Sequence, residues 1–396
     1  MNIIIHRGSH QIGGCVTEIN TENTRIFIDL GSELPDESGN IPEETLSIDG
    51  VTTGTMRCDG IFFTHYHGDH VGMLSQTMPD IPLFMGEAAK DIYLALQKRI
   101  SPDLIPAIEK INTFAAGVKM ELGDLSITPY WVDHSAFDAY MFLIESKGKR
   151  ILHTGDFRAH GFRGKSLLPV LNKYIGQVDI LLTEGTMLSR DDLYTISEHD
   201  LQQQARDLLK KYKYVFVICA STNIDRIASF HEATPRGKYF LCDSYQKDII
   251  EIARKHGEKH TSLYAFKKAL VYGKGLEEKA ERLGFCMMVR ANKKFCEIMQ
   301  RYKEHHNSDC FVIYSMWGGY LNQPNNMLKA MMEGFENTVT LHTSGHATHK
   351  AIRDVCNAVC PTQAIIPIHS SNPAGLEHLG LSHPIRYLKD REVFTL

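Results

Sequence analysis

Apolar residues fall into short runs separated by polar turns over the first 188 residues, a pattern that predicts β-sheets. Helical periodicity interrupts this pattern at two places, Gly86–Gln97 and Asp103–Ile111. The expected strands are Asn2–Ile5, Val16–Asn20, Arg25–Leu30, Gly60–Thr64, Ser126–Asp133, Ala139–Glu145, Arg150–Thr154 and Asp179–Thr183. We therefore expect the first part of the chain to be built mainly from strands.

The pattern changes after Leu188, where apolar runs alternate with longer amphipathic stretches. Expected helices lie at Glu198–Tyr212, Asn223–Glu232, Ser244–His256 and Leu276–Leu283, and expected strands at Val215–Cys219, Lys238–Cys242, Cys286–Val289 and Cys310–Tyr314. Alternation of this kind is typical of an α/β module with a parallel sheet. The pattern of the first part of the chain returns with an expected strand at Val339–Leu341, a helix at Lys350–Val359 and a strand at Gln363–Ile368. We predict a host domain, 1–188 plus 340–396, interrupted by an α/β module at 189–339.

Six of the apolar runs in the host domain end in a side chain that can bind a metal or move a proton. The residues at these ends are Asp29, the cluster that begins at His65, Asp133-His134, Asp156, Glu184 and His369. Any one of them would more often be a capping or surface residue. Their joint occurrence favours a single polar site at one end of the strands, held on rigid supports.

The densest of these ends places His65, His67, Asp69 and His70 within six residues, after the apolar run Ile61–Phe63. Imidazole and carboxylate are ligands that zinc and similar divalent ions prefer. Alternate residues of a loop point to opposite sides, so that this loop can serve two ions. The alternative is a surface loop that is rich in histidine by chance. Ligand-type residues at the other strand ends favour the metal site.

Composition indicates a soluble globular enzyme, with 43% hydrophobic and 23% charged residues. No apolar run is long enough to span a membrane, and the N-terminus lacks a signal-peptide pattern. Nine cysteines are dispersed, which favours reduced thiols and a cytoplasmic location. Cys356 and Cys360 are spaced like zinc ligands, but two cysteines of a buried helix are the better interpretation.

Charge is unevenly distributed, although the net charge is only −4. Residues 201–300 contain 19 Lys and Arg against 11 Asp and Glu, whereas the remainder is acidic. A basic middle segment suggests contact with a polyanion. A solvated lysine-rich surface explains the same count equally well.

The motifs together resemble a known family. The stretch T-H-Y-H-G-D-H (64–70), with Asp29 before it and His134 and G-D-F (155–157) after it, resembles the metallo-β-lactamase superfamily. L-L-T-E-G-T (181–186), H-T-S-G-H-A (342–347) and I-P-I-H-S (366–370) are similar to the additional motifs of the β-CASP nucleases. A-S-T-N-I-D-R (220–226) resembles a segment of the ribonuclease J branch. The resemblance implies an α/β fold, a metallo-β-lactamase αββα sandwich with an inserted β-CASP domain.

The resemblance also implies two zinc ions, with manganese as the alternative metal. One ion would be held by His65, His67 and His134. The other would be held by Asp69, His70 and His369, with Asp156 between the two ions. Asp29 would orient the site from behind the ligands.

Two metals of this kind suit phosphodiester hydrolysis. His346 is the expected proton donor to the leaving oxygen, with Glu184 holding its imidazole and raising its pKa. Asp69 is expected to act in catalysis as well as in metal binding. The alternative for His346 is a structural histidine in a glycine turn.

RNA is the expected substrate, because the RNA-directed members of the family resemble this chain in having histidine at position 369. The expected substrate-binding residues are His342, Ser344, Gly345, Ala347, Ser221 and Asn223. By resemblance to the ribonuclease J branch, the Ser344-Gly345 turn and Ser221-Thr222-Asn223 are the expected holders of a terminal 5′-phosphate. Simple capping turns explain the same residues. Two motifs depart from the ribonuclease J pattern, Glu184-Gly185-Thr186 and Ser370-Ser371-Asn372.

We thus predict a cytoplasmic zinc ribonuclease, acting as an endonuclease, a 5′→3′ exonuclease or both. The chain ends at Leu396, so we expect the C-terminal dimerisation domain of ribonuclease J to be missing and leave homo-oligomers open. The rivals are a DNA nuclease on the same scaffold, a lactone or thioester hydrolase, and an inactive RNA-binding scaffold. The last is disfavoured because every metal-ligand position is filled.

Overall fold

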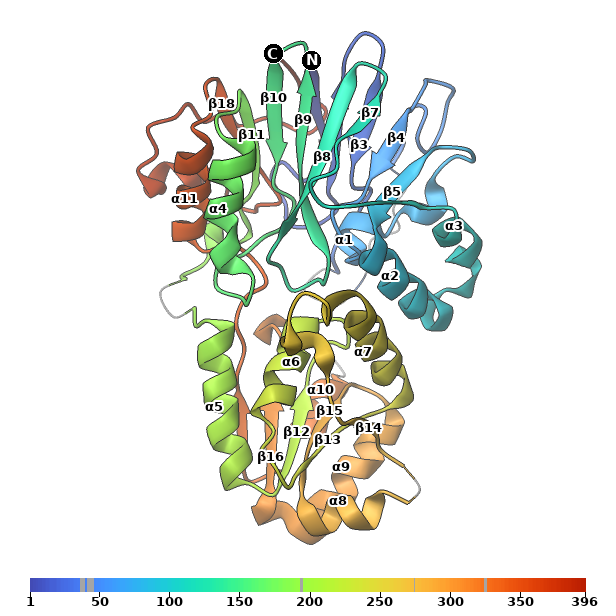
Figure 1. Ribbon diagram of the computed structural model, residues 1–396, viewed down its shortest axis with the longest axis vertical. Coiled ribbons are helices and arrows are strands. Elements are labelled where there is room, and N and C mark those ends of the chain that lie inside the picture. Colours follow the sequence, from blue (N-terminus) through green and yellow to red (C-terminus); the bar gives the residue numbers. More distant parts are fainter. Residues whose placement is uncertain (36–39, 41–45, 193–194, 274, 324–325) are drawn as a thin grey trace. The chain divides into compact units, whose positions relative to one another are not determined.

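A computed structural model describes residues 1–35, 40, 46–192, 195–273, 275–323 and 326–396 (Figure 1). The described residues form two compact units. The first holds the described residues of 1–36, 41–195 and 345–396, and the second holds 196–344 together with Asn40. The second unit therefore interrupts the first along the sequence.

The first unit contains two sheets that pack face to face. One sheet has the order β19-β1-β2-β3-β4-β5-β6 and the other the order β18-β11-β10-β9-β8-β7. The strands of the first sheet are β1 Asn2–Arg7, β2 Val16–Asn20, β3 Arg25–Ile28, β4 Gly60–Phe62, β5 Leu83–Gly86, β6 Asn112–Phe114 and β19 Val393–Thr395. The strands of the second are β7 Met120–Leu122, β8 Leu125–Val132, β9 Ala139–Ser146, β10 Lys149–His153, β11 Ile180–Glu184 and β18 Ala364–Ile368.

Alternation along the strands builds a separate core on each face of the second sheet. In β11, Ile180 and Leu182 pack against residues of the first sheet such as Ile26, whereas Leu181 packs with the helical residues Leu167 and Val355. The helices of this unit are α1 Gly68–Val71, α2 Glu87–Ile100, α3 Ile105–Glu109, α4 Leu167–Val170 and α11 His349–Val359. Helices α4 and α11 cover the second sheet, and α2 contacts β5 and β6 of the first (Figure 1). The unit is thus layered helix, sheet, sheet, helix.

Strand direction brings the C-terminal ends of the strands that precede the candidate site residues to one edge of each sheet. Strands β3 and β4 are parallel, and so are β10, β11 and β18. Strand β8 runs in the same direction as β10, because both are antiparallel to β9. The polar residues that follow these strands therefore leave each sheet at the same end.

The second unit has a parallel sheet with the order β14-β13-β15-β12-β16-β17. Its strands are β12 Tyr214–Ile218, β13 Tyr239–Cys242, β14 Ala269–Val271, β15 Phe285–Val289, β16 Cys310–Tyr314 and β17 Thr338–Thr340. Its helices are α5 Glu198–Lys211, α6 Ile224–Ala233, α7 Ser244–Gly257, α8 Glu277–Leu283, α9 Lys293–His306 and α10 Met327–Met332. The sequence pattern predicted the alternation but missed helices α9 and α10 and strand β14.

A buried ion pair joins α5 and α6 of the second unit to the segments that follow β16 and β17. The side chains of Glu198 and Arg226 are both 0% exposed, and Arg226 Nη2 lies 2.8 Å from Glu198 Oε1. Arg226 also donates to the Ser315 hydroxyl at 2.7 Å and to the carbonyl of Thr343 at 3.1 Å. These bonds fix the segment that leads back into the first unit.

Removing this arginine should strongly destabilise the second unit. We expect Arg226→Ala to lower its free energy of unfolding by about 3–5 kcal/mol, because the buried carboxylate of Glu198 would lose its cationic partner. Hydrogen exchange of the β12 amides in increasing urea measures the change. Exposed Arg236 is the matched control, and Arg236→Ala should stay within about 0.5 kcal/mol of the parent. Equal effects of the two substitutions would show that the pair is not structurally important.

Candidate metal centre

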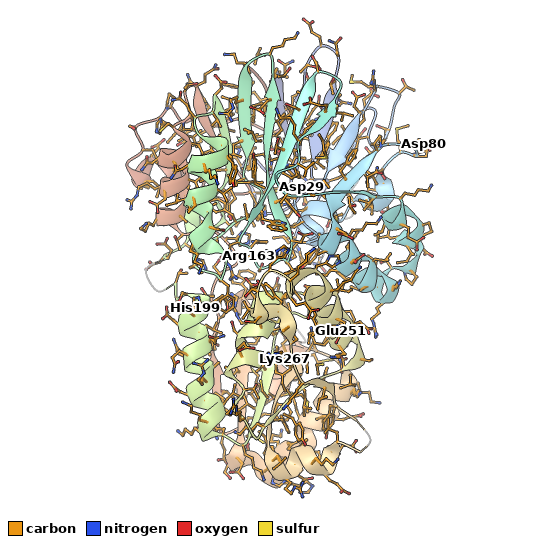
Figure 2. All side chains as sticks on the ribbon, viewed as in Figure 1. Asp29, Asp80, Arg163, His199, Glu251 and Lys267 are labelled. Atoms are coloured by element: carbon orange, nitrogen blue, oxygen red, sulfur yellow. The ribbon has the colours of Figure 1, made fainter. Side chains whose placement is uncertain are left out.

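Asp29 organises the centre from the end of β3. Its backbone adopts φ 62°, a left-handed conformation that costs energy for a non-glycine residue and is often found at functional sites. One carboxylate oxygen accepts the backbone N–H of Thr64 at 2.7 Å, and the other lies 2.7 Å from His70 Nδ1 (the position of Asp29 is marked in Figure 2). A proton on Nδ1 donated to this carboxylate leaves Nε2 of a neutral His70 ring unprotonated.

Three imidazoles converge beside this network. His65 Nε2 lies 3.0 Å from His67 Nδ1, and His134 Nε2 lies 3.3 Å from the same atom. His134 Nδ1 donates to the carbonyl of Gly345 at 2.6 Å, so its Nε2 is unprotonated in the neutral ring. If His67 Nδ1 carried a proton, it could donate to either His65 Nε2 or His134 Nε2, but not to both. A bound cation would accept the lone pairs of all three nitrogens, which is the arrangement of a metal site.

Burial favours the neutral form of these three rings. It lowers the pKa of His65 and His134 well below the usual value, and it lowers the pKa of His67 to about 4. Neutral imidazole is the form that binds metal. At neutral pH the three rings are therefore ready to act as ligands.

Asp156 lies at the junction of two donor groups, after β10. Its Oδ2 is 3.1 Å from His70 Nε2 and 3.9 Å from His134 Nε2, and its Oδ1 is 3.6 Å from His369 Nδ1. Asp69 completes the second group, with Oδ2 3.2 Å from His369 Nε2. Although burial opposes ionisation, the surrounding histidines hold the pKa of both carboxyls below the usual range. Asp156 is therefore positioned to contact both groups at once.

His369 follows β18 and is held in place from several sides. Its backbone φ is 52°, and its N–H donates to the carbonyl of Gly8 at 2.8 Å. Its ring Nδ1 lies 2.7 Å from the hydroxyl of Thr186, which leaves Nε2 facing Asp69. A left-handed histidine anchored in this way points its ring into the centre.

His346 and Glu184 form a pair at the border of the same cluster. Glu184 accepts the backbone N–H groups of Phe157 at 3.0 Å and Ala347 at 3.1 Å, and its Oε2 lies 3.2 Å from His346 Nδ1. Burial alone would lower the pKa of His346, but Glu184 and Asp156 raise it to about 9. Each of the groupings His65/His67/His134, His65/His70/Asp156 and Asp156/Glu184/His346/His369 has ligand atoms within 4.8 Å of one another.

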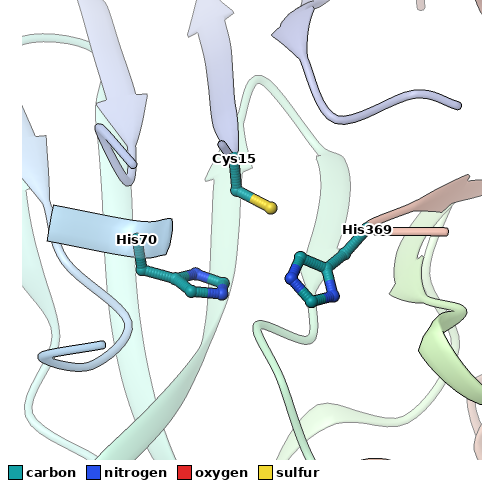
Figure 3. Close-up of side chains that lie close together, drawn as sticks. All are labelled: Cys15, His70 and His369. Carbon is teal, nitrogen blue, oxygen red and sulfur yellow. The ribbon is translucent and has the colours of Figure 1, made fainter. Parts of the chain in front are cut away.

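Cys15 also belongs to this cluster, and the sequence analysis did not identify it. Its sulfur and one ring nitrogen each of His70 and His369 lie within 4.8 Å of one another (Figure 3). The only signal in the sequence was its place after the two glycines that end the first turn.

The residues expected to bind the substrate are divided between the two units. Gly345 and Ala347 lie in the first unit, and His342, Ser344, Ser221 and Asn223 lie in the second. Two of them have roles within the fold. The side chain of Asn223 caps α6 by accepting from the N–H of Arg226, and the carbonyl of Ser221 accepts a hydrogen bond from the side chain of Gln246. Capping therefore accounts for Asn223.

Comparisons with known proteins agree with this architecture. Residues 49–216 match the model of the β-lactamase superfamily domain. A protein of unknown function from Enterococcus faecalis V583 shares the fold, with a TM-score of 0.80, 21% identity and coverage of 100% of this chain and 99% of that one. The predicted α/β fold class, with a metallo-β-lactamase domain, is confirmed.

Two relatives by sequence carry the same name. "Ribonuclease J" of Mycoplasma genitalium is 23% identical over 91% of this chain and 66% of its own length. "Ribonuclease J" of Helicobacter pylori strain J99 is 26% identical over 66% of this chain and 39% of its own length. The chain thus spans slightly less than two thirds of the Mycoplasma relative. Among the described residues, no helix is long and apolar enough to cross a membrane. Residues 49–216 therefore match a β-lactamase superfamily domain, and the chain is similar to ribonuclease J along most of its length.

Proposed function

We propose that this protein is a metal-dependent ribonuclease that hydrolyses RNA phosphodiester bonds with two divalent ions, zinc or manganese. The observation that carries the proposal is the pair of adjoining donor groups that meet at Asp156, beside the His346–Glu184 pair. The name shared by the sequence relatives supports RNA as the substrate.

The donor groups divide naturally between two ions. His65, His67 and His134 would hold one ion, because their nitrogens converge and burial keeps them neutral. Asp69, His70 and His369 would hold the other, and Asp156 contacts both groups. When bound, such ions supply Lewis acidity, which activates water and neutralises charge on a phosphoryl group.

The protein's own residues would supply orientation and the proton for the leaving group. Asp29 holds His70 by its Nδ1 and so fixes the direction of Nε2. His346 would donate a proton to the leaving 3′-oxygen, with Glu184 holding its Nδ1 and keeping the ring cationic. Asp69 would contribute to catalysis through its second oxygen, since only Oδ2 faces His369.

The substrate class is tested by comparing the cleavage of RNA with the cleavage of matched DNA. The purified chain is incubated with end-labelled RNA carrying a 5′-phosphate or a 5′-hydroxyl, and with matched DNA, in zinc or manganese. We expect cleavage of RNA and little cleavage of DNA. Cleavage of DNA without cleavage of RNA would contradict the assignment. Equal cleavage of the 5′-phosphorylated and the 5′-hydroxyl RNA would argue against recognition of a terminal 5′-phosphate.

A further inference from the structure

The turn between β1 and β2 is bonded to both segments that carry the second donor group. The carbonyl of Gly8 accepts the N–H of His369 at 2.8 Å, and the N–H of Cys15 donates to the carbonyl of Asp69 at 3.0 Å. The carbonyl of Cys15 in turn accepts the N–H of Gly31 at 3.0 Å. Cys15 is therefore fixed at its backbone between two segments that are far apart in the sequence.

The thiol of Cys15 points into the space between two of the donor imidazoles (Figure 3). Its sulfur, a ring nitrogen of His70 and a ring nitrogen of His369 lie within 4.8 Å of one another. All three residues are almost fully buried, with exposed fractions of 4%, 2% and 1%. A cation at that point would be within reach of the sulfur as well as of the two rings.

The turn that carries Cys15 and the two rings are held by local geometry. Gly8 has φ +104°, a backbone conformation that L-residues rarely adopt, and this supports glycine at the position in the turn that contacts Cys15. Both imidazoles are held from behind, His70 by Asp29 at 2.7 Å and His369 by Thr186 at 2.7 Å. The hydrogen bonds from Asp29 and Thr186 thus orient both rings. The sulfur of Cys15 faces the same space between them.

We infer that Cys15 is a further ligand of the second cation position, beside Asp69, His70 and His369. The inference rests on the proposed metal centre. As the sulfur-to-cation bond forms, the S–H bond breaks and its proton is released to solvent. Thiolate is a soft ligand that favours zinc and cobalt, whereas manganese and magnesium prefer oxygen. The second position is therefore selective for thiophilic metals.

Cobalt(II) provides a direct spectroscopic test. The chain is stripped of metal and titrated with cobalt while the visible ligand-field bands and the near-ultraviolet sulfur-to-cobalt band are recorded. We expect both sets of bands in the parent. Cys15→Ser should keep the ligand-field bands and lose the sulfur band. The control Cys356→Ala should retain both, because Cys356 lies on the buried face of α11, in the core.

The alternative outcomes separate this inference from the proposed function. A parent without the sulfur band, or a Cys15→Ser protein that keeps it, would overturn the role of Cys15. A sulfur band in a protein that cleaves no RNA would leave the ligand intact and refute the nuclease. A parent that binds no cobalt would refute the metal centre and the inference together.

Competition between zinc and manganese for the second position provides a second test. We expect Cys15→Ser to lower the affinity for zinc, relative to the affinity for manganese, by roughly tenfold or more. Unchanged relative affinities of the two metals would contradict ligation by sulfur. Binding competition requires no catalysis, so a fold defect would appear separately as loss of both metals.

Discussion

Replacing Asp156 with asparagine is expected to remove most of the bound divalent metal and to lower kcat about 10³-fold or more. The reason is its place between the two donor groups, with Oδ2 3.1 Å from His70 Nε2 and 3.9 Å from His134 Nε2. Loss of the carboxylate charge would weaken both groups together, and metal ions typically contribute several kcal/mol to catalysis, where each 1.36 kcal/mol is tenfold in rate. Metal analysis and single-turnover RNA cleavage measure the two effects.

The exposed residue Asp80 provides a matched control for that substitution (Figure 2). It has φ 70°, a conformation that asparagine tolerates, so that Asp80→Asn changes one charge without added strain. We expect this variant to keep the metals and the activity of the parent. An Asp156→Asn protein that binds metal as the parent does would contradict the position assigned to Asp156.

Replacing His346 with alanine should have the second largest effect, but of a different kind. We expect kcat to fall by roughly 10²–10⁴-fold, the usual contribution of a proton-transfer group, while both metals stay bound. The ring contacts Glu184 at 3.2 Å and Asp156 at 3.6 Å, and it lies at the border of the cluster rather than between the two donor groups. Metal content and kcat, measured on the same preparation, check the two parts of this expectation.

The control for this variant is His378→Ala, which removes an exposed histidine and should change neither quantity. The structure also offers a competing role, because His346, Asp156, Glu184 and His369 form a group that can hold a metal. Loss of metal from the His346→Ala protein would support that role and would contradict proton donation.

Much of the architecture follows from local patterns. Strand β2 was predicted at Val16–Asn20 and is found there, because its apolar residues are bounded by glycines and by a polar turn. The polar residues at strand ends could be predicted to meet, since strands of one direction deliver them to the same edge. Asp29 shows this most clearly because it follows β3 directly, and Asp156 follows β10 after Thr154 and Gly155.

Other features depend on contacts that no local pattern contains. Strand β17 is only Thr338–Thr340, three exposed residues, and its pairing with β16 decides where it belongs. Helix α9 buries Phe295, Met299 and Tyr302 at helical spacing, but its many charged residues obscure that spacing. Cys15 has no neighbouring ligand in the sequence, and its role becomes visible only when Asp69 and His369 are placed around it.

The most direct test of the central claim is a metal titration of the stripped protein with RNA cleavage as the readout. We predict that the metal-free chain is inactive and that two equivalents of zinc per chain restore cleavage. Full activity without metal, or saturation at a single equivalent, would contradict a centre of two ions joined by Asp156.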